Sequence, residues 1–134
     1  MITLILGKKG SGKTKKLIDL CAAATAESKG NVVFIEKDNT LTYDLSHRVR
    51  LVSAVDFGIC GFEKLYGFVA GMCAGNYDIT DIFIDSTLKI GGTDMAALDA
   101  FVEKVAHLEA NIILSVSADK TEIPAHIAQI AQEI

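Results

Sequence analysis

Eight residues near the start of the chain combine the groups that a bound phosphate chain needs. Glycines let the backbone turn sharply and bring its N–H groups close to phosphate oxygens. A lysine after the last glycine can place its ammonium between the β- and γ-phosphates, and a threonine hydroxyl can bind magnesium. The spacing therefore predicts a phosphate-binding loop for ATP, or another nucleoside triphosphate, with Mg²⁺. The residues are, in order, Gly7, Lys8, Lys9, Gly10, Ser11, Gly12, Lys13 and Thr14.

The loop is flanked by the two elements that such a site requires. Residues 3–6 form a short apolar run typical of a strand, and residues 13–28 show the period of an amphipathic helix. The first turn of that helix directs unpaired N–H groups and a partial positive charge at the phosphates. Lys8, Lys9 and the pair at 15–16 add positive potential, although each alone is typical of a solvated side chain.

The second candidate group is the carboxylate of Asp85, which follows the apolar residues 82–84 at the end of an expected strand, 79–84. Ligands of open α/β sheets bind outside the carboxyl ends of the strands, so we expect Asp85 to face the same crevice as the loop. There it can hold Mg²⁺ together with the Thr14 hydroxyl, in part through water. Asp81 is a weaker candidate because it lies toward the other end of that strand.

Short apolar runs alternate with helical periods along the rest of the chain. The segment 40–54 alternates only weakly, through Leu41, Tyr43 and Leu45, and indicates a hairpin or an extended excursion. The alternation predicts one α/β domain spanning residues 1–134, a three-layer α/β/α fold with a mostly parallel sheet and a small core. We expect further strands at 32–35 and 112–116, and helices at 62–74, 95–108 and from Pro124 through Ile127 and Ile130 to Ile134.

Composition narrows the class of protein. Half of the residues are hydrophobic and the mean hydropathy is +0.34. No apolar run approaches the roughly 18 residues of a membrane span, and the first residues do not resemble a signal peptide. The net charge of −4 argues against a nucleic-acid binder. We therefore expect a cytoplasmic protein.

Two further patterns concern cysteines and glycines. Cys21, Cys60 and Cys73 lack metal-ligand spacing, and we expect each to be a small core residue within an apolar helical stretch. Glycines recur every fourth residue over 67–75, and we expect that helix face to pack closely on the sheet or on a partner helix.

Residues 7–14 and 82–85 resemble the Walker A and Walker B motifs of P-loop nucleoside triphosphatases. Asp85 is followed by Ser-Thr-Leu rather than by the pattern of GTPases, and residues 117–120 do not match the GTPase base-recognition motif. The resemblance is greatest to the additional-strand branch, which includes RecA-like ATPases. It implies that the strand 112–116 lies between the other two motif strands. It also implies that Ser115 or Ser117 senses the γ-phosphate, with simple serines at a strand end as the equal alternative.

The same resemblance suggests how hydrolysis could be assisted. Ser86 stands where many such ATPases carry a glutamate, so Glu36, after the second strand, is the candidate general base or water-positioning residue. A solvated carboxylate is the competing account. Arg48 and Arg50 are the chain's arginines and are candidates for an arginine finger that reaches a neighbouring subunit. A solvated strand face is again the alternative.

The sequence thus supports three functional hypotheses. The first is a slow RecA-like ATPase that acts as a switch or accessory in an assembly, with Lys13, Glu36 and Asp85 as its catalytic residues. The second is a nucleotide-sensing module with little or no hydrolysis, and the third is a small-molecule kinase. Because the chain shows no strand beyond the loop strand, we expect the last helix, a homo-oligomer or another protein partner to cover that sheet edge.

Overall fold

The computed structural model describes residues 1–41 and 44–133. They form a six-stranded, all-parallel sheet in the order β3-β2-β4-β5-β1-β6. The strands are β1 (Ile2–Leu6), β2 (Asn31–Glu36), β3 (Val49–Ser53), β4 (Ile79–Ile84), β5 (Asn111–Val116) and β6 (Ala131–Glu133). The helices are α1 (Lys13–Glu27), the 3-10 turn η1 (Val55–Phe57), α2 (Phe62–Gly75), α3 (Thr87–Gly91), α4 (Met95–Val105) and α5 (Ala125–Ala128).

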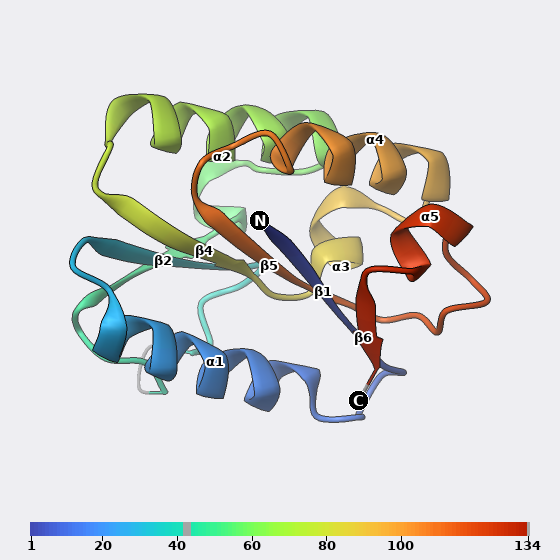
Figure 1. Cartoon of the computed structure of the whole chain (residues 1–134), viewed down its shortest axis with the longest axis horizontal. Coiled ribbons are helices and arrows are strands. Elements are labelled where there is room, and N and C mark those ends of the chain that lie inside the picture. The colour runs from blue at the N-terminus through green and yellow to red at the C-terminus, as the bar shows by residue number, and fades with distance from the viewer. Residues whose placement is uncertain (42–43, 134) are drawn as a thin grey trace.

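The expected α/β class and three-layer arrangement are confirmed. Helix α1 lies on one side of the sheet, while α2 and α4 lie on the other (Figure 1). Successive residues of the inner strands are buried on opposite faces, because side chains alternate across a strand. Ile82 and Ile84 of β4 join the larger core cluster, whereas Phe83 joins the smaller cluster under α1. Strand β5 lies between β1 and β4, as the sequence resemblance implied.

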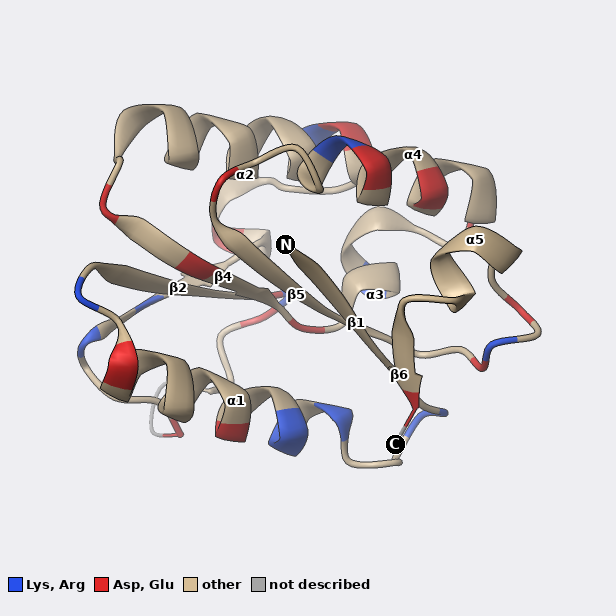
Figure 2. Cartoon of the chain, in the orientation of Figure 1, with Lys and Arg blue, Asp and Glu red and all other residues tan. Residues whose placement is uncertain are grey.

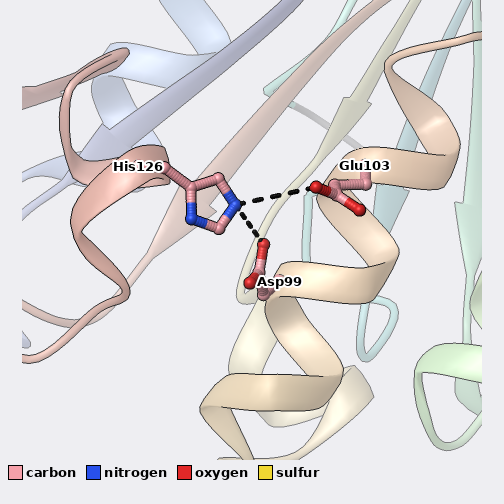
Figure 3. Close-up of side chains that lie close together, drawn as sticks. All are labelled: Asp99, Glu103 and His126. Atoms are coloured by element: carbon pink, nitrogen blue, oxygen red, sulfur yellow. Dashed lines mark ion pairs between the residues drawn. The ribbon is translucent and has the colours of Figure 1, made fainter.

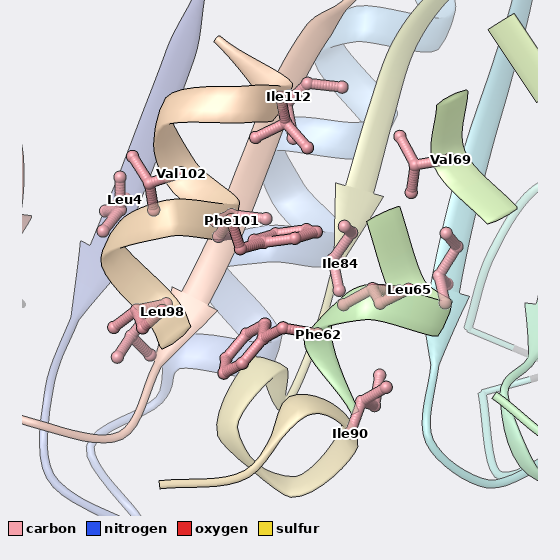
Figure 4. Packing of buried hydrophobic residues seen from close by; sticks show 14 of the residues in the cluster. Leu4, Phe62, Leu65, Val69, Ile84, Ile90, Leu98, Phe101, Val102 and Ile112 are labelled. Carbon is pink, nitrogen blue, oxygen red and sulfur yellow. The ribbon is translucent and has the colours of Figure 1, made fainter. Parts of the chain in front are cut away.

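The larger core cluster fixes α2 and α4 on the sheet. Phe62 of α2 and Phe101 of α4 are both buried, and their ring centroids lie 5.3 Å apart (Figure 4). Leu65, Leu98 and Ile84 surround this pair. Buried aromatic pairs of this kind contribute both apolar area and a preferred ring geometry. The two helices therefore form one continuous layer.

Two expected elements differ from the structure. Within 40–54, the hairpin alternative is wrong for residues Val49–Ser53. They are extended, as the other alternative predicted, and they pair in parallel with β2 as the edge strand β3. The final helix is also shorter than expected: it covers only Ala125–Ala128 and is followed by β6. Strand β6 pairs with β1, so the edge of the loop strand is covered by a strand rather than by a helix. The homo-oligomer or protein partner stays a prediction. The predictions for Tyr43 and Ile134 lie outside the described residues.

The glycine and cysteine predictions also need correction. A Cβ atom built at Gly67, Gly71 or Gly75 would meet none of the described atoms within 4 Å, so this face of α2 is open rather than closely packed. Cys21 is buried in α1 as expected, and burial raises the pKa of its thiol to about 11. Cys60 is instead exposed and lies before α2, outside any helix. Within the described part of the chain, no helix is long and apolar enough to span a membrane.

Candidate functional site

The loop between β1 and α1 has the backbone conformation that its glycines permit. Gly10 and Gly12 have φ angles of 83° and 94°, in the left-handed region that residues with a Cβ rarely adopt. Gly12 stands immediately before α1, whose first residue is Lys13. The amide of Ser11 donates to the Lys8 carbonyl over 3.0 Å, which closes a tight turn. The loop thus leads into a fifteen-residue helix with its N-terminus at the end of β1.

Thr14 and Asp85 meet across the site although they lie 71 positions apart in sequence. The hydroxyl of Thr14 donates to Oδ2 of Asp85 over 2.9 Å. Asp85 is buried, with 6% of its surface exposed, and follows directly after β4. Oxygen ligands are those that Mg²⁺ prefers, so a hydroxyl and a carboxylate in contact at a cavity wall fit this ion. The two residues predicted to hold the metal are therefore brought together.

Ser115 of β5 completes this group. Its hydroxyl donates to Oδ1 of Asp85 over 2.6 Å and accepts from the backbone amide of Ser86 over 2.8 Å. The predicted sensor residue Ser115 is thus buried and positions the Asp85 carboxylate. Ser117 also lines the cavity but lies beyond the end of β5. Both serines are at the site, whereas their response to a γ-phosphate stays a prediction.

Lys13 is largely buried at the start of α1, and its ammonium donates to the Lys8 carbonyl over 2.9 Å. Burial lowers its pKa below the ordinary value of 10.5; the Asp85 charge raises that pKa, and the nearby cation of Lys89 lowers it further. A buried cation beside a second cation is favoured by an additional negative charge. A phosphate chain is a ligand that would supply that charge.

These groups line one cavity of about 440 Å³, within the size range of small-molecule sites. The blue segments of the loop and of the start of α1 in Figure 2 are lysines. Two of the lining residues, Leu88 and Lys89, belong to α3 and were missed by the sequence reasoning. No periodic signal marks so short a helix, which follows Ser86 in a left-handed conformation with φ 55°. The cavity is lined by Lys9, Gly10, Gly12, Lys13, Thr14, Asp85, Ser86, Leu88, Lys89, Ser115 and Ser117.

Glu36 is buried at the end of β2 and has other partners. Its Oε1 accepts from the amide and the hydroxyl of Thr40, and its Oε2 accepts from the amide of Leu41. The described residues that line the 440 Å³ cavity do not include Glu36. This geometry favours a structural role for Glu36, which holds the segment after β2, and the proposed role as general base has no support from it.

Replacing Glu36 with glutamine is expected to lower the free energy of unfolding by about 1–3 kcal/mol, because an amide cannot accept all three of these partly buried hydrogen bonds. Urea unfolding would measure this effect, with exposed Asp38→Asn as the matched control. The folded fraction of the variant should keep whatever ATP turnover the parent chain has. A turnover loss of about a hundredfold or more, with unchanged stability, would instead restore the general-base role.

Arg48 and Arg50 lie at the amino ends of the parallel strands, away from the glycine loop. Arg50 in β3 stands opposite Val33 near the start of β2. Both arginines are exposed and line a separate cavity with Asn31 and Ile79, which begin β2 and β4. The loop lies at the carboxyl ends of the parallel strands, so these arginines do not reach the site of their own chain. A role at a neighbour's site stays a prediction.

Comparisons with known proteins do not assign the chain to a family. No protein-family model matches the chain, and no curated protein sequence matches it either. The functional argument therefore depends on the site itself.

Proposed function

We propose that this chain binds ATP, or a closely related nucleoside triphosphate, together with Mg²⁺, as a P-loop protein of the RecA-like type. The observation that carries the proposal is the contact between Thr14 and Asp85 at the wall of the 440 Å³ cavity. The position of β5 between β1 and β4 supports the additional-strand arrangement.

Each loop group has a distinct part in binding. Backbone N–H groups from Gly10 to Thr14 wrap the phosphates at the N-terminus of α1. Lys13 exchanges its Lys8 carbonyl for phosphate oxygens, and the cation of Lys89 approaches the same cavity from α3. Mg²⁺ would be held by Thr14 and Asp85 and would neutralise phosphate charge.

Slow ATP hydrolysis in a switch or accessory protein is the activity we propose. Among the described lining residues Asp85 is the sole carboxylate, and both of its oxygens already accept hydrogen bonds. A water nucleophile therefore lacks a strong base at the cavity, which limits the rate. The same observation favours the second candidate, a nucleotide sensor that reads ATP against ADP with little hydrolysis.

Phosphate release with Mg-ATP, beside ATP and ADP titrations, separates these functions. Turnover that disappears in Lys13→Ala would establish the ATPase. Tight binding of nucleotide without turnover would establish the sensor. Failure of the wild-type chain to bind either nucleotide would contradict both.

A further inference from the structure

A second group of chemically active side chains lies on α4 and α5, outside the nucleotide cavity. Asp99 and Glu103 stand one helical turn apart on α4, and His126 projects toward them from α5 (Figure 3). The Nε2 atom of His126 is 2.6 Å from Oδ1 of Asp99 and 3.9 Å from Oε1 of Glu103. One nitrogen and two carboxylate oxygens thus converge within 4.8 Å of one another.

The position of His126 is set by the core. Its neighbour Ile127 is 2% exposed and belongs to the larger core cluster. Pro124 precedes the short helix and accepts from the amides of Ile127 and Ala128. Because α5 is held in this way, the imidazole is directed at α4 rather than left free on a loop.

The Nε2 atom of His126 and Oδ1 of Asp99 lie at ion-pair distance, without the geometry of a hydrogen bond. Oδ1 of Asp99 is shielded from solvent and accepts no hydrogen bond from any group in the described part of the chain. A shielded carboxylate oxygen without a donor is unfavourable unless a cation lies beside it. In addition, two like charges one helical turn apart repel each other. The imidazole nitrogen and the two carboxylate oxygens therefore face a shared centre, where a cation would be favoured.

We propose that Asp99, Glu103 and His126 form a binding site for a divalent transition-metal ion such as Zn²⁺. One imidazole and two carboxylates form a ligand set that Zn²⁺ accepts, with a fourth position for water. Metal–ligand distances of about 2.0–2.2 Å require ligand atoms roughly 3.0–3.6 Å apart. The 2.6 Å separation must therefore widen and the 3.9 Å separation must shorten, by about half an ångström each.

Small side-chain rotations are sufficient for this change. The side chains of His126 and Glu103 are 55% and 70% exposed, so neither is confined by packing. Asp99, at 28% exposed, is the most confined ligand. The ion would join α4 to α5, the helix that leads into β6 at the sheet edge beside β1. The site thus joins the end of the chain to its core, independently of the proposed nucleotide function.

Calorimetric titration of nucleotide-free protein with Zn²⁺ tests this site. The chain should carry Cys60→Ser throughout, because an exposed thiol also binds Zn²⁺. We expect one equivalent to bind and raise Tm. Affinity should fall at least about tenfold in His126→Gln and in Glu103→Gln. Exposed His107 provides the matched control, and His107→Gln should bind Zn²⁺ as the parent does.

Two results would overturn the proposal. One is the absence of Zn²⁺ binding by the parent chain at neutral pH, which would leave the three side chains with their mutual contacts alone. The other is equal Zn²⁺ affinity in His126→Gln and His107→Gln, which would place the ion elsewhere. Both substituted histidines are exposed, so loss of folding does not confuse the comparison.

Discussion

Replacing Lys13 with alanine is expected to weaken Mg-ATP binding by about 10- to 150-fold, the equivalent of about 1.5–3 kcal/mol for a charge-assisted contact. The ammonium is buried at the cavity, and Asp85 is its main opposing charge. A phosphate chain would satisfy this cation, so its removal eliminates an interaction that no other side chain can replace in the same place. Calorimetric titration with Mg-ATP measures the change.

The matched control for this variant is Lys16→Ala. Lys16 lies on the exposed face of the same helix, so its removal changes the net charge equally but should alter affinity by less than about threefold. Burial lowers the pKa of Lys13, so keeping this side chain charged costs stability in the nucleotide-free protein. The hydrogen bond from Lys13 to the Lys8 carbonyl opposes this cost, so Lys13→Ala should unfold at nearly the same urea concentration as the parent. A lower urea midpoint, together with weaker binding, would mean that binding was lost through misfolding.

Replacing Phe101 with alanine is expected to lower the free energy of unfolding by about 3–5 kcal/mol. The ring is 2% exposed and lies against Phe62 between α2, α4 and the sheet (Figure 4). Its removal takes away apolar contacts and leaves a cavity that this rigid layer cannot close. Total stabilities of domains are about 5–15 kcal/mol, so the variant should be close to marginal stability.

Urea unfolding measures this loss, with Phe57→Ala as the control. Phe57 is 58% exposed in η1 and meets Phe68 at 6.2 Å between ring centroids. Its removal should cost less than about 1 kcal/mol, because most of the ring is already hydrated. Similar losses for Phe57 and Phe101 would contradict the position of the core described here.

The elements that sequence predicted well are those with strong periodic signals. The buried central strands are continuous apolar runs, and the glycine loop between β1 and α1 has a fixed spacing. Asp85 could be assigned to the same edge because parallel strands end together. The contact with Thr14 then follows because a single strand, β5, separates β1 from β4 in the sheet order.

The elements that sequence missed carry weak or ambiguous signals. Edge strand β3 is exposed on part of its surface, so its alternation is faint and its parallel pairing with β2 depends on tertiary contacts. Strand β6 has three residues, and the isoleucine spacing before it fits a helix equally well. The glycine spacing on α2 marks a face of that helix, but spacing alone does not reveal whether the face is covered.

The candidate site also contains features that the sequence predicts and features that it does not. Lys89 reaches the cavity through the short helix α3, which has no sequence signal of its own. Glu36 stands at the expected strand end, but its hydrogen bonds to Thr40 and Leu41 depend on the fold of the following segment. Side-chain hydrogen bonds of this kind depend on the three-dimensional fold and cannot be predicted from residue spacing. The phosphate loop, in contrast, is defined by local backbone geometry.

Nucleotide binding at the glycine loop can be tested by mapping backbone amide chemical shifts during a titration with Mg-ATP. We expect saturable shifts at the amides from Gly10 to Thr14, with further shifts at Ser86 and Lys89 around the same cavity. Amides beside Arg48 and Arg50, at the opposite end of the sheet, should stay unchanged. An absence of saturable shifts, or shifts confined to the arginine end, would contradict nucleotide binding at this loop.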